Sequence, residues 1–260
     1  MKTAASVADL ARRPPSGLVV LCYHRVGGRT PVSVDLPTPL FADQIAELAA
    51  TTTVLELDTA VERHLAGEDL SGHACVTFDD GTADIVEEAL PVLERHRVPA
   101  TVFVATRHVD EGVDFPGGGR VVSWAALADA AATGLLTVEA HTHGHLLCDR
   151  ADPGVLADDL DRCRDAIAGA LGRAPRHLAY PKALAPSPDN LAVVRARFRS
   201  AWVAGTRAVR PGDDPHLLAR SPVQTADGLV WFRRKLAGGL GLEDRIRGAV
   251  DRRRHAGATT

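Results

Sequence analysis

Two adjacent carboxylates, Asp79 and Asp80, follow an apolar run and precede a glycine in the stretch ACVTFDDG at 74–81. Neither has a positively charged neighbour in the sequence, so another part of the chain must supply the counter-charge. Three histidines lie in HTHGH at 141–145, directly after a second apolar run. Neutral imidazoles and a carboxylate are suitable ligands for a divalent cation, and the cation offsets the repulsion between two neighbouring acids. The pattern predicts a metal site in which one aspartate is a ligand and the other is free for acid–base chemistry.

The choice among the three histidines is open at this point. In an extended segment His141 and His143 would lie on the same face, whereas a tight turn at Gly144 would let His141 and His145 converge. A lone histidine of this kind is more often a polar loop residue. Three histidines within five residues, together with a strand-end Asp-Asp-Gly, favour the metal site.

Short apolar runs alternate along the chain with longer stretches of helical periodicity, which is the pattern of repeated βα units. The carboxyl ends of parallel strands lie on one side of a sheet or barrel, so two clusters that follow strands can face one cleft. Pro91 lacks an amide hydrogen and should kink or split its helix. We expect strands over 17–24, 73–78, 99–106, 135–141, 177–181 and 200–205, helices over 38–52, 82–97, 123–134, 153–171 and 190–198, a last helix starting near Asp227, and a glycine-rich loop over 110–120.

Length and composition predict one ordinary globular domain. The chain has 260 residues, 45% of them hydrophobic and 24% charged, with a formal net charge of -3. This composition argues against a nucleic-acid partner, and the arginines of 244–254 are expected to form a solvated helix face. We expect an N-terminal extension at 1–16, a catalytic domain at 17–242, and a helical end with a loose tail at 243–260.

The compartment is predicted from what the sequence lacks. No apolar run is long enough to span a membrane, and the N-terminal stretch does not have the form of a signal peptide. The four cysteines show no paired C-x-x-C spacing, which favours reduced thiols. We therefore expect a cytoplasmic protein without an integral membrane segment.

The joint occurrence of TFDDG and HTHGH resembles the polysaccharide deacetylase family, which is carbohydrate esterase family four and carries the NodB homology domain. The segments LCYHRV, VPATVFV, LAYPKA and LLARSPV support the resemblance, which covers roughly residues 18–236. It implies a distorted, incomplete (β/α) barrel with about seven strands. It also implies a metal-dependent amide hydrolase that removes the acetyl group of an N-acetylated amino sugar, in an oligosaccharide, a polysaccharide precursor or a sugar conjugate.

By this resemblance Asp79 is the general base. The ligands of one divalent ion are Asp80, His141 and His145, with Zn2+ as the usual ion and Co2+ or Ni2+ able to substitute. The backbone amide of Lys182 would donate a hydrogen bond to the oxyanion of the reaction. The residues expected on the substrate side of the site are Tyr180, Pro181 and His143.

The chain departs from the family pattern in three places, and one of them is the absence of an arginine close before Pro181. Lys182 and Ala183 replace the Tyr-Gly that usually follows the proline. Arg220 stands where many members have a histidine that protonates the leaving amine, and a guanidinium does not release a proton near neutral pH. We therefore expect Arg220 to pair with Asp79 and keep it ionised, with an ordinary surface ion pair as the alternative. His24, at another predicted strand end, is the expected general acid.

Two other functions are open. The same metal and base would serve a hydrolase of a non-sugar amide, such as a formamide, a cyclic amide or a ureide. The missing family histidine also allows a catalytically impaired homologue that binds metal without turnover. An amide panel and a metal analysis would distinguish these alternatives from a sugar deacetylase.

Overall fold

The computed structural model describes residues 17–239, in which seven parallel strands form a closed barrel. The barrel closes because β1 pairs with β10 on one side and with β5 on the other. From β5 to β10 each strand pairs in parallel with the next one along the chain. The predicted (β/α) barrel is confirmed. Its strands are β1 (Val19–Tyr23), β5 (His73–Phe78), β6 (Ala100–Val104), β7 (Leu136–Ala140), β8 (His177–Ala179), β9 (Ser200–Ala204) and β10 (Leu218–Pro222).

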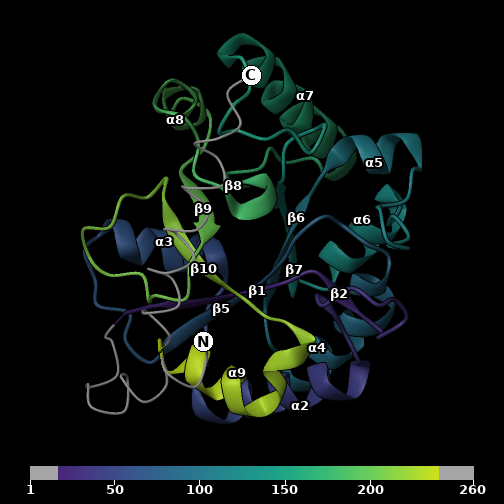
Figure 1. The fold of residues 1–260 in the computed structure, drawn as a ribbon, viewed down its shortest axis with the longest axis vertical. Helices are drawn as coiled ribbons and strands as arrows, with labels where there is room; N and C mark the ends of the chain where they lie inside the picture. Colours follow the sequence, from purple (N-terminus) through teal and green to yellow (C-terminus); the bar gives the residue numbers. More distant parts are fainter. Residues whose placement is uncertain (1–16, 240–260) are drawn as a thin grey trace.

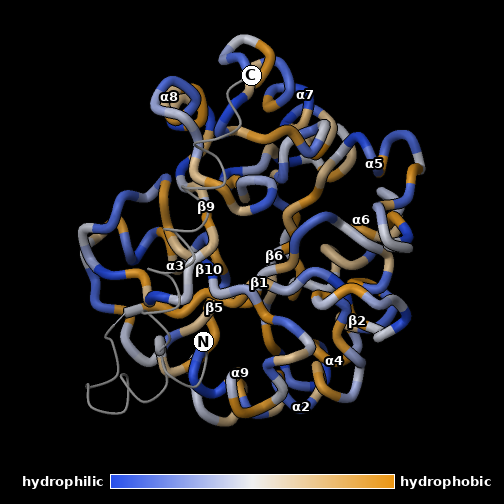
Figure 2. The backbone as a smooth tube through the Cα atoms, viewed as in Figure 1, coloured by the Kyte–Doolittle hydropathy of each residue, from blue (hydrophilic) through white to orange (hydrophobic). Residues whose placement is uncertain are grey.

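Helices surround the strands, with α2, α4 and α9 together on one side and α7 and α8 on the opposite side (Figure 1). Hydropathy follows this arrangement, since apolar segments are concentrated along the central strands and hydrophilic ones in the outer loops (Figure 2). The helices are α2 (Thr38–Thr51), α3 (Leu57–Leu65), α4 (Leu90–His96), α5 (Thr106–Glu111), α6 (Trp124–Ala132), α7 (Pro153–Leu171), α8 (Pro188–Arg195) and α9 (Gly228–Leu236), with shorter helical turns η1 (Ile85–Ala89), η2 (Pro181–Ala183) and η3 (Thr225–Asp227).

Three further strands are short. β4 (Thr53–Val54) pairs with the first residues of β5, and β2 (Arg25–Val26) pairs with β3 (Asp35–Leu36) in a separate two-stranded sheet. None of the helices within 17–239 combines the length and apolar character that crossing a bilayer requires. The four cysteines are buried free thiols.

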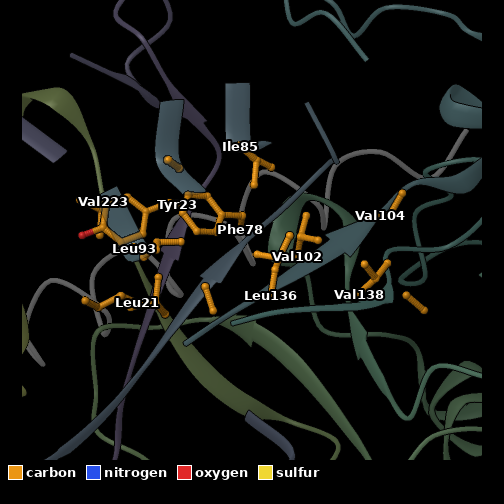
Figure 3. Close-up of a cluster of buried hydrophobic side chains, with 14 of the residues drawn as sticks. Leu21, Tyr23, Phe78, Ile85, Leu93, Val102, Val104, Leu136, Val138 and Val223 are labelled. Atoms are coloured by element: carbon orange, nitrogen blue, oxygen red, sulfur yellow. The ribbon is translucent and has the colours of Figure 1, made fainter. Parts of the chain in front are cut away.

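Successive residues of a strand face opposite sides, and this alternation divides the core into two layers. One layer lies between the strands and the outer helices; Figure 3 shows part of it, including Leu21 and Phe78 of the strands and Leu93 of α4. The other layer contains Val20 and Leu218, whose side chains point to the opposite face of their strands, toward the inside of the barrel. This layer packs against α3. Residues with this orientation fill the barrel, so those at its carboxyl end point into the site described below.

Most predicted elements are present with shifted ends. Pro91 splits its predicted helix as expected, because a π-helical turn at η1 gives way to α4 next to this proline. The sequence pattern did not predict α3, α5, β4 or β10. β10 contains an arginine, a serine and a proline, and it therefore lacks the apolar run by which strands are recognised. The extension predicted at 1–16 and the tail predicted at 243–260 lie outside the described residues.

Candidate active site

The two aspartates follow β5 at a sharp turn of the chain. The backbone N–H of Asp79 donates to the carbonyl of Tyr23 at 3.0 Å, which extends the pairing of β5 with β1. Asp80 then has a φ of 73° and Gly81 a φ of 96°, both in the left-handed region. The carbonyl of Asp80 accepts a hydrogen bond from Ala105 at 3.0 Å, which fixes the turn against β6. The change in backbone direction sends the two neighbouring carboxylates to different partners.

A second turn positions the histidines. His141 directly follows β7, and the chain reverses before His145, which has a φ of 53°. The carboxylate of Asp159, on α7, accepts backbone hydrogen bonds from His143 at 2.7 Å and from Gly144 at 2.8 Å. This carboxylate holds the turn, which is the arrangement that lets the first and third histidines converge.

Asp80, His141 and His145 form a cluster that fits a divalent cation. The Nε2 atoms of both histidines lie 3.6 Å from Oδ1 of Asp80, and the three ligand atoms are all within 4.8 Å of one another. Nδ1 of His141 donates to the carbonyl of Ala179 at 2.8 Å, which leaves Nε2 unprotonated and free to bind a metal. One carboxylate and two imidazoles match the donor set of a zinc-type site that keeps coordination positions open.

Burial keeps both imidazoles of this cluster neutral. It lowers the pKa of His141, and the neighbouring carboxylates compensate only in part. The pKa of His145 is lowered to about 4. Burial is the largest cause, and the positive charge that a protonated His141 would add is the second. Neutral imidazole is the form that binds a metal, so protons compete weakly with a metal for His145 above about pH 4.

The metal-free protein is expected to lose stability as the pH falls from 6.5 toward 4. In that range the unfolded chain protonates His145 and the folded chain does not, so protons favour unfolding; below about 4 both states are protonated and this contribution stays constant. The expected loss is on the order of 1 to 3 kcal/mol. Urea denaturation with a chelator present, at several pH values, measures it. His145→Gln should flatten the dependence, and equal slopes in the two proteins would contradict its assignment to His145.

Asp79 pairs with Arg220 inside the barrel. The guanidinium Nη1 donates to Oδ1 at 2.6 Å and Nη2 donates to Oδ2 at 2.8 Å, with a further bond from Nη1 to Thr77 Oγ1 at 3.2 Å. Arg220 is 1% exposed and Asp79 3% exposed, so this is a buried pair and not a surface ion pair. Burial alone would raise the pKa of Asp79, but the charge and hydrogen bonds of Arg220, together with nearby His141 and His24, outweigh it and hold this pKa well below its usual range. The carboxylate is therefore ionised at any physiological pH.

Cys22 and His24 lie near the same carboxylate. Sγ of Cys22 lies 3.5 Å from Oδ2 of Asp79, and burial strongly raises the pKa of the thiol. Nδ1 of His24 is buried and has no hydrogen-bond partner within residues 17–239. Sequence reasoning identified His24 but missed Cys22. The signal for it is strand alternation, because Cys22 lies two residues before His24 and shares the inward parity of Val20.

Both carboxylates open onto one cavity of about 740 Å³. Lys182 also lines this cavity; it follows Pro181 in η2 and adopts a left-handed φ of 56°. All seven residues predicted as base, acid, oxyanion donor, carboxylate anchor and metal ligands line this cavity. The full lining is Cys22, His24, Val34, Asp79, Asp80, His141, His145, Asp149, Lys182, Ala183, Leu184, Ala185, Val203, Ala204, Gly205, Arg207, Ala219, Arg220, Pro222 and Gln224.

Three predicted substrate contacts do not reach the cavity. Tyr180 is fully buried and its hydroxyl donates to the carbonyl of His216 at 3.0 Å. The ring of His143 instead hydrogen-bonds Thr106 Oγ1 through Nδ1 at 2.9 Å, because the turn directs it toward α5. Pro181 is also buried beside the cavity and is not part of its lining. Sequence reasoning missed three polar residues that do line it, which come from loops and strand ends without a recognisable motif: Asp149, Arg207 and Gln224.

Carboxylates and imidazoles gathered at the carboxyl ends of the strands of a closed parallel barrel are the arrangement found in (β/α) barrel enzymes. A sequence model described as polysaccharide deacetylase matches residues 67–196. The chain belongs to the polysaccharide deacetylase family.

Two curated relatives are poly-beta-1,6-N-acetyl-D-glucosamine N-deacetylases. The chain is 27% identical over 158 residues to the one from Staphylococcus aureus (strain MSSA476), and 26% identical over 153 residues to the one from Staphylococcus epidermidis. Each match covers 56% of this chain and 52% of the relative, so the chain spans about half the length of these proteins.

Solved structures show the same fold. IcaB from Ammonifex degensii aligns with a TM-score of 0.73 and 28% identity, over 85% of this chain and 97% of that one. The Streptococcus pyogenes deacetylase PplD aligns with a TM-score of 0.73 and 17% identity, over 84% of this chain and 98% of that one.

Proposed function

We propose that the chain is an N-deacetylase that hydrolyses the N-acetyl group of an N-acetylated amino sugar and releases acetate and a free amine. One observation carries the proposal: the Asp80, His141 and His145 cluster and the ionised Asp79 face the same cavity. Membership of the family and the names of the curated relatives support a saccharide of N-acetylglucosamine as the substrate. The catalytic unit that we propose is the domain at 17–242, described by the structure over 17–239.

Asp80, His141 and His145 are the proposed ligands of a divalent cation. Their facing ligand atoms and lowered imidazole pKa values fit Zn2+, and the donor set also accommodates Co2+ or Ni2+. A cation bound there would supply polarisation of the acetyl carbonyl and activation of a water molecule.

Asp79 is the proposed general base, which takes a proton from the attacking water. Arg220 holds both carboxylate oxygens, so the base is ionised and fixed in one orientation. Because the guanidinium keeps its own protons, Arg220 positions the base and is not the acid of the reaction. This division of labour explains why the chain places two aspartates side by side.

Lys182 and His24 complete the proposed reaction. The backbone amide of Lys182 donates a hydrogen bond to the carbonyl oxygen as negative charge develops on it. As the carbon–nitrogen bond breaks, His24 gives a proton to the leaving amine. A ring nitrogen of His24 lies within 4.8 Å of a carboxylate oxygen of Asp79, so the proposed acid and base share one side of the cavity.

Replacing His24 by glutamine is expected to lower kcat by about 100-fold, which is within the range for loss of a general acid. Glutamine approximates the size of the imidazole but delivers no proton at neutral pH. Steady-state kinetics and metal analysis of the same preparations measure the effect. His73→Gln, at the opposite end of the barrel on β5, is the matched control and should keep full turnover. Unchanged turnover in His24→Gln at unchanged metal content would remove His24 from the mechanism.

The function itself is tested by acetate release from N-acetylglucosamine oligomers with zinc-loaded protein. Acetate formed in step with free amine would support the proposal. Hydrolysis of a formamide, cyclic amide or ureide without release of acetate from any sugar would refute the substrate and leave amide hydrolysis in place. One bound metal ion without turnover on any amide would indicate an impaired homologue.

A further inference from the structure

A second set of metal-ligating atoms lies beside the first and shares no residue with it. Cys22, His24 and Asp79 each offer one ligand atom, and these three atoms are all within 4.8 Å of one another. We propose that this set is a second cation site, selective for zinc and other thiolate-binding divalent cations, and that its occupation inhibits the enzyme. A thiolate, an imidazole and a carboxylate are three of the ligand types that zinc takes in proteins.

The spacing of the donor atoms suits one ion. Zinc–sulfur and zinc–oxygen bonds of about 2.3 Å and 2.1 Å, at a tetrahedral angle, place the two ligand atoms about 3.6 Å apart. Sγ of Cys22 lies 3.5 Å from Oδ2 of Asp79. Nδ1 of His24 is buried without a hydrogen-bond partner within residues 17–239, so this ring has a nitrogen that no other contact satisfies. Two of the three donor atoms therefore already stand at the spacing that one ion would bridge.

The second site should fill after the first. Both oxygens of Asp79 already accept hydrogen bonds from Arg220, so an incoming cation must share this carboxylate with a guanidinium. Binding also converts the Cys22 thiol into a thiolate and releases one proton to solvent for each ion bound. No fixed positive side chain is bonded to Asp80 in the described part of the chain, and that cluster takes the first ion at lower concentration.

Occupation of the second site would stop turnover because it takes the two groups assigned as base and acid. A cation on Asp79 and His24 occupies the lone pairs with which they accept and relay protons. The inhibitory consequence rests on the proposed function, whereas binding of a second ion does not.

Titration of the metal-free protein with Co2+ tests the binding directly. The first equivalent should bind without a thiolate-to-cobalt charge-transfer band in the near ultraviolet, and the second should produce this band. Cys22→Ser should abolish the band. In equilibrium dialysis this variant should bind the second ion at least 10-fold more weakly and the first ion with unchanged affinity. Cys163→Ala, which removes a buried thiol on α7, is the control and should keep the band. Saturation at one equivalent, or a second equivalent without the band, would overturn the proposal.

Zinc titration of acetate release tests the consequence. Activity should rise up to one equivalent of zinc and fall beyond it. When the activity of each protein is normalised to its own value at one equivalent, the inhibitory zinc concentration should be at least 10-fold higher for Cys22→Ser than for the parent protein. Equal inhibition of both proteins would refute an inhibitory role for this site. If no acetate is released at any zinc concentration, the proposed function fails, while the cobalt titration still decides whether the second site exists.

Discussion

Asp79→Asn is expected to lower kcat by about 100-fold to 10,000-fold, with one equivalent of metal still bound. Asparagine keeps the size and one acceptor oxygen of the side chain but does not take up a proton at neutral pH. The proposed ligands Asp80, His141 and His145 are not altered, so metal content should stay near that of the parent protein. Acetate release and metal analysis on the same sample measure the two quantities separately.

Loss of metal together with loss of turnover would contradict this division of labour, because Asp79 would then act through the metal site. Full turnover in the variant would contradict its role as the base. The matched control is Asp80→Asn, which should lose metal affinity and, as a consequence, activity. The two neighbouring aspartates are thus distinguished by which measurement each of them changes.

Arg220→Met is expected to destabilise the protein by about 3 to 5 kcal/mol, the range found when one partner of a buried ion pair is removed. The variant leaves the Asp79 carboxylate buried without its counter-charge. Asp79→Asn leaves the opposite problem, an unpaired guanidinium beside Phe103, whose ring centre lies 4.9 Å from it. The free energy of unfolding from urea denaturation should therefore fall in both single variants.

The double variant Asp79→Asn with Arg220→Met separates stability from chemistry. It buries no unpaired charge at this position, so it should recover most of the stability that either single variant loses. It should nevertheless release no acetate above the level of Asp79→Asn. A double variant less stable than both single ones would show that the charge pair is not the cause of the losses.

The same pair has a pH signature. The pKa of Asp79 is lower in the folded than in the unfolded state, so its contribution to stability is fully present above the unfolded-state value of about 3.9. The contribution is lost as pH falls through the lower, folded-state pKa. This acid dependence is separate from that of His145, which acts between 6.5 and about 4.

The sequence was sufficient for the repeated βα pattern and for the two clusters that follow β5 and β7. Strand ends are local features, since an apolar run that stops at Asp-Asp-Gly identifies its own carboxyl end. The split helix at Pro91 was predictable for the same reason, because proline changes backbone bonding at its own position. β10 was missed because it has no distinctive apolar run when it is separated from the barrel that it helps to complete. α3 was missed although Leu57, Ala60 and Val61 recur at helical spacing on its buried face.

Residue types and their spacing determined which chemistry this protein can perform: carboxylates and imidazoles at strand ends, with an arginine far along the chain as counter-charge. Only the tertiary structure decided which histidines meet, because left-handed backbone at His145 and the bonds to Asp159 turn His143 away. Closure of the barrel brings Arg220 to Asp79 across 141 positions of sequence, as expected from the sequence, and it places Cys22 against the same carboxylate, which was not expected. Such contacts join strands that are far apart in the sequence, so they follow from the closure of the barrel and not from the residues of one segment.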